Sequence, residues 1–249
     1  MAEERPTDQP AAEETRPRHD TSRIPDVIPI IGSGATVMYP SQLMPVLAKE
    51  DADIRAIDEA AVTPAKVIGI FAQRAVDGQH EGDMYPLGTA ATIARLAKSP
   101  DGSLQAVLQG VARIRLLGIE QSAPYQQGRV ESIPEELEHN LKLEAMARSA
   151  VANFQRIVNT SDAMPKELSM AVTAISDPGA LADFIAANLQ IKTEDRQAVL
   201  EAVNVSKRLR LALNILNHEL EVSEMESKIQ AEVKGEIDKR QREYILREQ

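Results

Sequence analysis

The end of the chain constrains the fold most, because residues 209–249 have the pattern of one long helix. They contain no proline and a single glycine, Gly235, while apolar side chains recur at helical spacing through Ile229, Val233 and Ile237. Helices usually end with a glycine, an asparagine or a proline near the last apolar position, and the final residues here are strong helix formers instead. We therefore expect a projecting helix that leads toward a further part of a longer protein.

Charged residues support a helix that is exposed along its length. Acidic residues precede basic ones by four positions at Glu224 and Lys228, Glu236 and Arg240, Asp238 and Arg242, and Glu243 and Arg247. Each such pair contributes about 0.2–0.5 kcal/mol on an exposed helix. The apolar residues keep no strict heptad, which favours an amphipathic arm over a continuous coiled coil.

Composition limits the classes of protein to which the chain can belong. Its 249 residues suffice for two compact units, and an aromatic content of 3% without tryptophan indicates aliphatic cores. The absence of cysteine excludes disulfides, thiolate metal ligands and a cysteine nucleophile, and it is compatible with a cytoplasmic location. A net charge of -10 works against a nucleic-acid partner. No segment reaches the roughly 18 apolar residues of a membrane span, so we expect a soluble protein.

The chain divides into a tail and a β-rich unit before the helices. Residues 1–23 have almost no apolar side chain larger than alanine and are expected to form a disordered tail. In the unit expected over residues 24–133, the prolines of residues 24–31 favour an edge strand or an extended lead-in. A second strand is expected at residues 43–47, a helix at 52–61, and a buried central strand at 67–72.

The clearest local signal is Ser99-Pro100-Asp101-Gly102-Ser103, which predicts a hairpin between residues 92–98 and 104–109. Beyond Gly110, the alternation of Val111, Arg113 and Arg115 with Ala112, Ile114 and Leu116 indicates another half-exposed strand. A small antiparallel, barrel-like sheet is the simplest way to join these strands.

The pattern becomes helical after Pro134, and a helical bundle is expected over residues 134–208. Apolar residues predict a helix from Leu143 to Ile157 and another from Pro165 to Ile175. Asp177-Pro178 is typical of a capped helix start, and Thr193 with two following acidic residues opens a fourth helix. The fold class expected is therefore α+β, with a small β domain, a helical bundle and the long helix.

No residue pattern indicates catalysis, a metal or a cofactor. Gly32-Ser33-Gly34 is not followed by the Gly-Lys-Ser/Thr of a phosphate loop, and Ser33 is not in a nucleophile elbow. His218-Glu219 lacks a second histidine, because position 222 is Val. The abundant carboxylates occupy polar helix faces, where charge usually serves solvation. We expect no catalytic, metal-binding or cofactor-binding residue in this segment.

A group of methionines and tyrosines is the one candidate for binding. Its members are Met38, Tyr39, Met44, Met84 and Tyr85. Methionine is flexible and polarizable, so such residues suit contact with many different apolar segments. For each residue taken separately, ordinary core packing is the more frequent role.

Several motifs occur together along the chain. They are the ending Gln241-Arg242-Glu243-Tyr244-Ile245-Leu246-Arg247-Glu248-Gln249, the helix Asp177-Pro178-Gly179-Ala180-Leu181-Ala182-Asp183, the segment Lys228-Ile229-Gln230-Ala231-Glu232-Val233-Lys234, Leu87-Gly88-Thr89-Ala90, and the hairpin Pro100-Asp101-Gly102. Together these motifs resemble the amino-terminal region of bacterial Lon, the ATP-dependent protease. The resemblance covers residues 24–249 and is strongest after Asp177.

The resemblance implies a PUA-like β domain, a helical bundle and a long helix that leads to an ATPase module. It also implies that the phosphate loop and the Ser-Lys protease pair lie after Gln249, so ATP and Mg²⁺ belong to the parent protein. The family's amino-terminal region captures unfolded or damaged proteins and helps a homohexamer assemble. The alternative is a stand-alone adaptor or small-ligand binder built from the same domain, and an enzyme active within these residues is the third possibility.

Overall fold

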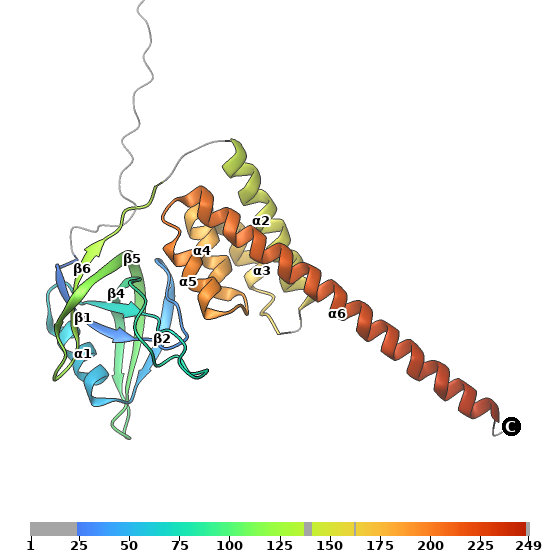
Figure 1. Cartoon of the computed structure of the whole chain (residues 1–249), viewed down its shortest axis with the longest axis horizontal. Coiled ribbons are helices and arrows are strands. Elements are labelled where there is room, and N and C mark those ends of the chain that lie inside the picture. The colour runs from blue at the N-terminus through green and yellow to red at the C-terminus, as the bar shows by residue number, and fades with distance from the viewer. Residues whose placement is uncertain (1–23, 137–140, 162, 248–249) are drawn as a thin grey trace, which may run out of the picture.

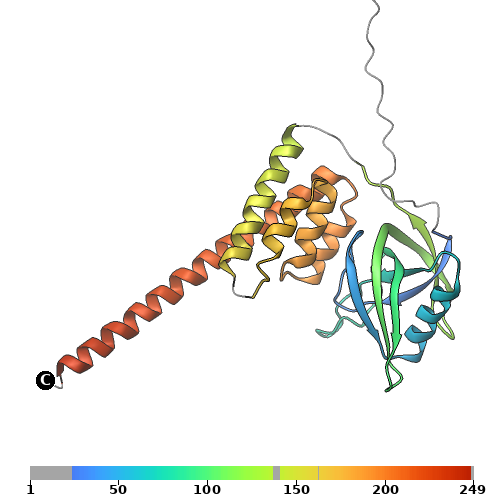
Figure 2. The same cartoon turned by 180° about the vertical axis from the view of Figure 1, so that it is seen from behind.

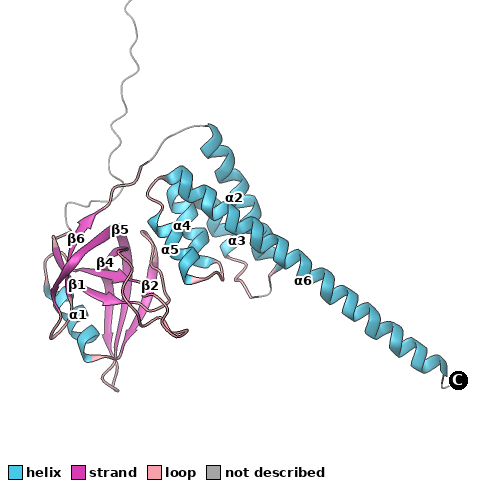
Figure 3. Cartoon of the chain, viewed as in Figure 1, coloured by secondary structure: helices cyan, strands magenta, loops and turns pink. Residues whose placement is uncertain are grey.

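The α+β fold expected from the sequence is confirmed. In the computed structural model, which describes residues 24–136, 141–161 and 163–247, a β-sheet unit is followed by helices that pack beside it and by one long helix (Figures 1 and 3). The tail expected at residues 1–23 lies outside the described residues. The ends of the β-rich unit at residue 133 and of the helical bundle at residue 208 stay predictions.

The sheet contains a barrel of five strands with a sixth strand attached to it. The strands are β1 (Val27–Gly32), β2 (Leu43–Ala48), β3 (Val67–Phe71), β4 (Leu87–Lys98), β5 (Leu104–Gln121) and β6 (Gln127–Ser132). They follow the order β2-β5-β4-β3-β1-β6, and β5 also pairs with β6, which closes a ring that leaves out β2. β1 and β3 run parallel and the other pairs are antiparallel, so the sheet is mixed and not purely antiparallel as expected.

Two expectations about strands were wrong. β1 is not an edge strand, because it lies between β3 and β6. Pro29 is tolerated there since the β1–β3 register begins one residue later, at Ile30. The residues after Gly110 do not start a new strand either, because β5 runs through them. A register shift opposite Ala90 and Ala91 leaves Val111 as an extra residue. Such a bulge bends the strand, so that β5 pairs with β2 before this point and with β6 after it.

The hairpin between β4 and β5 is confirmed. Gly102 has a φ of +86°, a conformation that favours glycine, and the Ser99 amide donates to the Ser103 carbonyl at 2.9 Å. The Asp101 carboxylate accepts from the Ser103 amide at 3.0 Å and from its hydroxyl at 2.7 Å. The expected helix is also present as α1 (Asp51–Val62), which buries Ala56, Ile57 and Ala60 against the sheet.

The helices form a second core beside the barrel. They are α2 (Leu141–Thr160), α3 (Leu168–Ala171), the 3-10 turn η2 (Val172–Ala174), α4 (Pro178–Asn188), α5 (Thr193–Glu201) and α6 (Val205–Arg247). The expected cap at Asp177 is present, because its side chain accepts from the Gly179 amide at 3.1 Å. The rings of Phe154 and Phe184 meet edge to face in this core, with centroids 5.8 Å apart.

α6 packs on the other helices only along its first part. Leu209, Ala212, Leu216 and Leu220 are buried, whereas Met225 is exposed, and the rest of the helix extends away from the molecule (Figures 1 and 2). Glu224 forms an ion pair at 2.9 Å with Arg156 of α2. The three later pairs expected on this helix involve side chains outside the described ones.

Candidate functional site

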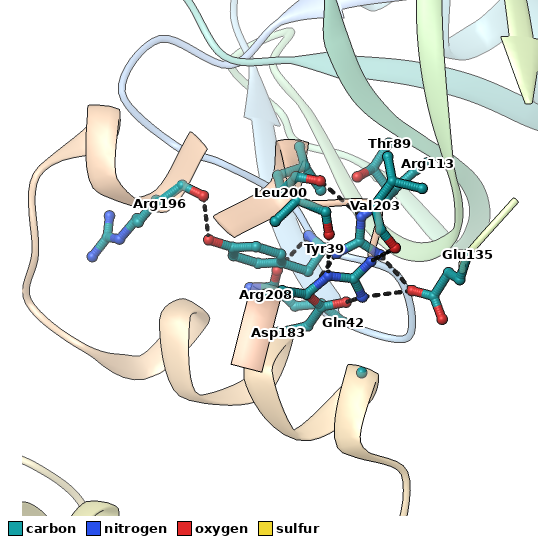
Figure 4. Close-up of polar contacts among 12 residues, drawn as sticks. Tyr39, Gln42, Thr89, Arg113, Glu135, Asp183, Arg196, Leu200, Val203 and Arg208 are labelled. Carbon is teal, nitrogen blue, oxygen red and sulfur yellow. Dashed lines mark hydrogen bonds and ion pairs between the residues drawn. The ribbon is translucent and has the colours of Figure 1, made fainter. Parts of the chain in front are cut away.

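The turn before β2 is held tightly between the barrel and the helices. The Tyr39 amide donates to Gln42 Oε1 at 3.0 Å, and the Tyr39 hydroxyl donates to the Arg196 carbonyl of α5 at 2.7 Å (Figure 4). Thr89 of β4 donates to the Met38 carbonyl at 2.6 Å. Ser41 has a φ of +64°, which is uncommon for a residue other than glycine. The turn therefore has one defined conformation with a strained residue at its tip.

Gly110 of β5 allows this turn to approach the sheet. A Cβ atom at position 110 would lie 2.2 Å from the Tyr39 carbonyl oxygen, a distance at which the main chain must move. The Ser41 amide donates to the Gly110 carbonyl, and the Gly110 amide donates to the Gln42 carbonyl, both at 2.9 Å. Any larger residue at position 110 would push the turn away from β5.

Two buried arginines join the barrel to the helices behind this turn. Arg113 of β5 donates to Asp183 Oδ1 of α4 at 2.6 Å, to Glu135 Oε1 at 2.9 Å and to the Leu200 carbonyl at 2.8 Å. Arg208 of α6 shares Glu135 Oε1 at 2.6 Å and lies 3.6 Å from Asp183 Oδ2. We name Arg113, Arg208, Asp183 and Glu135 the arginine clamp (Figure 4). Two positive and two negative charges balance within it.

Burial governs the ionisation of the groups around the clamp. Burial raises the pKa of Asp183, while Arg113 and Arg208 oppose that rise. The pKa of the Tyr39 hydroxyl is raised well above its ordinary value, first by burial and second by the nearby Asp183 charge. Tyr39 therefore remains protonated and keeps its hydrogen bond to Arg196 across the working pH range.

A cleft of about 510 Å³ lies between the Tyr39 turn and the helices. We name it the Tyr39 cleft. One wall is the turn with the start of β2, and the other is formed by the end of α3, by Ile175 after η2, and by α4. Its lining is Tyr39, Pro40, Ser41, Gln42, Leu43, Ala171, Ile175, Ala180, Asp183, Phe184, Ala187 and Asn188. Most of these side chains are apolar, and Asp183 belongs both to the cleft and to the arginine clamp.

The outward face of β2 continues this apolar surface along the sheet. Leu43, Pro45 and Leu47 point to the same side, and Leu43 and Leu47 are 61% and 52% exposed. A second concavity of about 780 Å³ lies over this strand and its neighbours, and Pro45, Leu47, Arg95, Ala97, Gln105 and Val107 are among its lining residues. We name these six residues together with Leu43 the β2 face. Contiguous exposed apolar residues of this kind mark interaction surfaces.

The structure separates the five residues for which substrate contact was expected. Met38 and Met44 lie in the core under α1, whereas Tyr39 and Tyr85 lie in the core that joins the barrel to α4 and α5. Met84 is half-buried against a third cluster of apolar residues. Tyr39 lines the Tyr39 cleft, and the other four do not. Substrate contact by the five stays a prediction, and the burial of all but Met84 means that little of their surface faces solvent.

The sequence pattern missed the residues that build the site. The alternation after Gly110 places Arg113 on an exposed strand face, which was wrong, because its side chain is 1% exposed. α4, α5 and α6 cover that face. The only signal for the β2 face was Leu43, Pro45 and Leu47 at period two on a strand with an internal proline.

Among the described residues, no three His, Cys, Asp or Glu side chains lie close enough together to hold a metal ion. Within the same ranges, none of the helices is both long enough and apolar enough to cross a membrane.

The sequence matches known proteins over most of its length. Residues 27–218 match the family model of the ATP-dependent protease La (LON) substrate-binding domain. The chain is 37% identical over 237 residues to a Lon protease of Dictyoglomus thermophilum and 35% identical over 229 residues to Lon protease 2 of Myxococcus xanthus. These alignments cover 95% and 91% of this chain but only 30% and 28% of the relatives, so the chain spans less than a third of their length.

Solved structures share the fold. The N-terminal domain of a Mycobacterium avium complex Lon protease superposes with a TM-score of 0.64 at 23% identity, over 77% of this chain and 98% of that one. A Lon N-terminal domain protein from Xanthomonas campestris gives a TM-score of 0.55 at 16% identity, over 76% and 97%. The matched residues 27–218 include the barrel, the Tyr39 cleft, the arginine clamp and the packed part of α6, and on that match the chain belongs to the family of Lon substrate-binding domains.

Proposed function

We propose that this chain is the non-catalytic substrate-recognition and assembly region of an ATP-dependent Lon serine protease that degrades misfolded and regulatory proteins. One observation carries the proposal: in a member of this family, the apolar Tyr39 cleft adjoins the exposed β2 face. Unfolded proteins expose apolar side chains that native proteins bury, so such a surface distinguishes the two.

The remaining parts of the function lie in the parent protein. ATP and Mg²⁺ are used by its motor, the protease pair cleaves the substrate, and the protein works in the cytoplasm as a homohexamer. α6 is the element that extends away from the packed helices, as a connection to a motor requires (Figure 1). Each substrate contact is weak alone, and several copies around a ring raise the total affinity.

Binding of one protein in its unfolded and native forms tests the recognition step. We expect the chain to bind a fluorescently labelled, permanently unfolded variant and to leave its native form unbound in an anisotropy titration. Leu43→Asp places a charge at the cleft and is expected to weaken binding about tenfold, because burial of a leucine contributes about 1.5–3 kcal/mol. Leu117→Asp is the matched control, since Leu117 is 56% exposed and lies outside both concavities. Equal binding of the two forms, or equal loss in both variants, contradicts the proposal.

A small-ligand binder is the second candidate, and the size of the Tyr39 cleft favours it. The cleft holds about 510 Å³, within the range of about 300–1,000 Å³ that is usual for ligand pockets. A thermal-shift screen of small apolar metabolites separates the two candidates. A ligand that stabilises the wild type but not Leu43→Asp, together with no binding of unfolded protein, favours this second function.

A further inference from the structure

β2 has a free main-chain edge. It stands at the end of the strand order and pairs only with β5 among the described residues, while β5 and β6 close the barrel at the other end. Exposed edges present unpaired N–H and C=O groups that can pair with another strand.

The pairing of β2 with β5 shows which main-chain groups of β2 face away from β5. The Gly110 amide donates to the Gln42 carbonyl, so residue 42 faces β5. Because orientation alternates along an antiparallel strand, Met44 and Val46 also face β5, whereas Leu43, Pro45 and Leu47 turn their main chain outward. Pro45 has no N–H, and this register places it where the β5 ladder needs none. Outside the β2–β5 ladder, no hydrogen bond between described main-chain groups involves these three residues.

We propose that the outward edge of β2 binds an extended segment of an unfolded protein as an added β-strand. The proposal rests on the function proposed above and specifies how the substrate is held. Main-chain hydrogen bonds supply affinity for any sequence, and every second side chain of the added strand lies beside Leu43 and Leu47. This mode suits a protein whose substrates share no sequence.

Charge defines which segments fit best. Arg95 is the only charged residue that lines the concavity over β2, and it has no ion-pair partner among the described residues. It lies in one row with Val107 and Pro45, because Arg95 pairs with Val107 and Val107 with Pro45. The chain as a whole carries a charge of -10 and repels acidic segments elsewhere. The segment that fits is therefore extended, apolar and marked by a carboxylate.

A second copy of the chain fits this edge less well. Two β2 strands that paired edge to edge would bring two prolines into one short ladder, and each proline lacks a donor. Proline on an edge is a known device against self-pairing. It leaves the Leu43 and Leu47 amides available to a segment of different sequence.

Hydrogen exchange on the full chain is the decisive test. The probe is a labelled decapeptide of alternating leucine and threonine with one central glutamate, at a concentration that saturates the chain by anisotropy. We expect the Leu43 and Leu47 amides to exchange at least about tenfold more slowly in the complex, because each gains a hydrogen bond. Unchanged exchange at both amides in the saturated complex overturns strand addition while the proposed function stands. Absence of any binding, with unfolded protein as well, overturns both.

Two variants of one residue separate the main chain from the side chain. Leu47→Pro and Leu47→Ala both remove the leucine, but only the proline removes the outward N–H. We expect Leu47→Pro to bind the decapeptide about tenfold more weakly than Leu47→Ala. Equal affinities of the two variants, both folded by thermal unfolding, count against an added strand. If Leu47→Pro fails to fold, the exchange rates of the wild type decide.

Charge reversal tests the carboxylate. Wild type is expected to prefer the glutamate decapeptide to its lysine counterpart by about fivefold at low salt, and Arg95→Glu is expected to reverse the order. Arg115→Glu is the matched control on the neighbouring strand, since Arg115 is exposed and does not line the concavity. An unchanged order in Arg95→Glu overturns the charge preference.

Discussion

Arg113 and Arg208 are the most buried charged side chains among the described residues, with exposed fractions of 1% and 0%. Each donates to main-chain carbonyls as well as to carboxylates: Arg113 to Leu200, and Arg208 to Ala202. A buried ion pair contributes little net stability against an apolar pair of the same shape, but the loss of one partner leaves a charge without compensation. The arginine clamp therefore makes the contact between barrel and helices specific.

Arg113→Met is expected to destabilise the chain by about 3–5 kcal/mol, because it leaves Asp183 buried beside a single arginine. Arg115→Met on the same strand is the control. Its ion pair with Glu131 spans 3.6 Å between half-exposed side chains, so we expect a change below about 1 kcal/mol. Chemical denaturation measures both. Similar effects in the two variants contradict a special role for the clamp.

Tyr39 links stability to pH in the alkaline range. Its folded pKa is raised, so the unfolded state loses the phenolic proton first, and the stabilisation is complete below a pH of about 10 and declines as pH rises above it. We expect Tyr39 to lower the free energy of unfolding of the wild type by up to about 1.4 kcal/mol per pH unit above 10. Tyr39→Phe should remove that part of the slope when unfolding is measured at pH 8 and pH 11. An identical slope in both proteins contradicts the assignment.

The residues of the clamp show where sequence reasoning stops. Arg113 follows a strand alternation in which polar positions normally face water, and nothing within ten residues of it signals burial. Its cover comes from Asp183 and Leu200, which are 70 and 87 residues away along the chain. The Asp177 cap was predictable because all its atoms come from neighbouring residues.

At the scale of elements, β5 joins the parts of the sheet. It pairs with β2 from Leu104 to Gln109 and with β6 from Ile114 to Gln121, while β4 pairs with it from Leu104 to Arg115. The extra residue Val111 and the small residue Gly110 stand where these partners change. The hairpin at Gly102 was predictable from local turn chemistry, whereas the closure by β6 depends on pairing between distant segments, which has no local signature.

Gly110→Ala is expected to destabilise the chain by about 1–3 kcal/mol and to displace the Tyr39 turn, because the new methyl group meets the Tyr39 carbonyl. Gly118→Ala is the control on the same strand, since a Cβ there meets nothing within 4 Å. It should leave stability unchanged or raise it slightly. Thermal unfolding and the amide shifts of Ser41 and Gln42 report the two effects. A Gly110→Ala protein as stable as wild type contradicts the packing argument.

At the scale of the whole molecule, the barrel and the helices share one contact region, and α6 extends from it (Figures 1 and 2). The core between them contains Tyr39, Tyr85 and Leu87 from the sheet and Val199 and Leu200 from α5. The sequence predicted the order of these parts, because hydrophobic periodicity changes after Pro134. It did not predict how they pack, since the contact joins residues that are far apart along the chain and that no sequence pattern connects.

The burial of α6 predicts two classes of amide exchange. Amides near Leu209 and Leu216 should exchange only through global unfolding, because both side chains are fully buried. Those from Val222 to Ile229 should exchange faster by several orders of magnitude, since the side chains there that the structure describes have no apolar cover. Mass-spectrometric or NMR exchange on the 249-residue chain measures this. Uniform protection from Leu209 to Ile229 would mean that a partner covers the helix in solution.

The arginine clamp also sets a rule for recombination between relatives. A crossover in the connection after β6 looks harmless, because it falls between the last strand and the first helix. It nevertheless parts Arg113 from Asp183 and Leu200, which follow the connection along the chain. It also parts Arg113 from Glu135 if the crossover precedes residue 135. A hybrid that exchanges the barrel alone must therefore bring an arginine at position 113 to meet the acid at position 183, and homologous segments in this fold are interchangeable only as a charge-matched set.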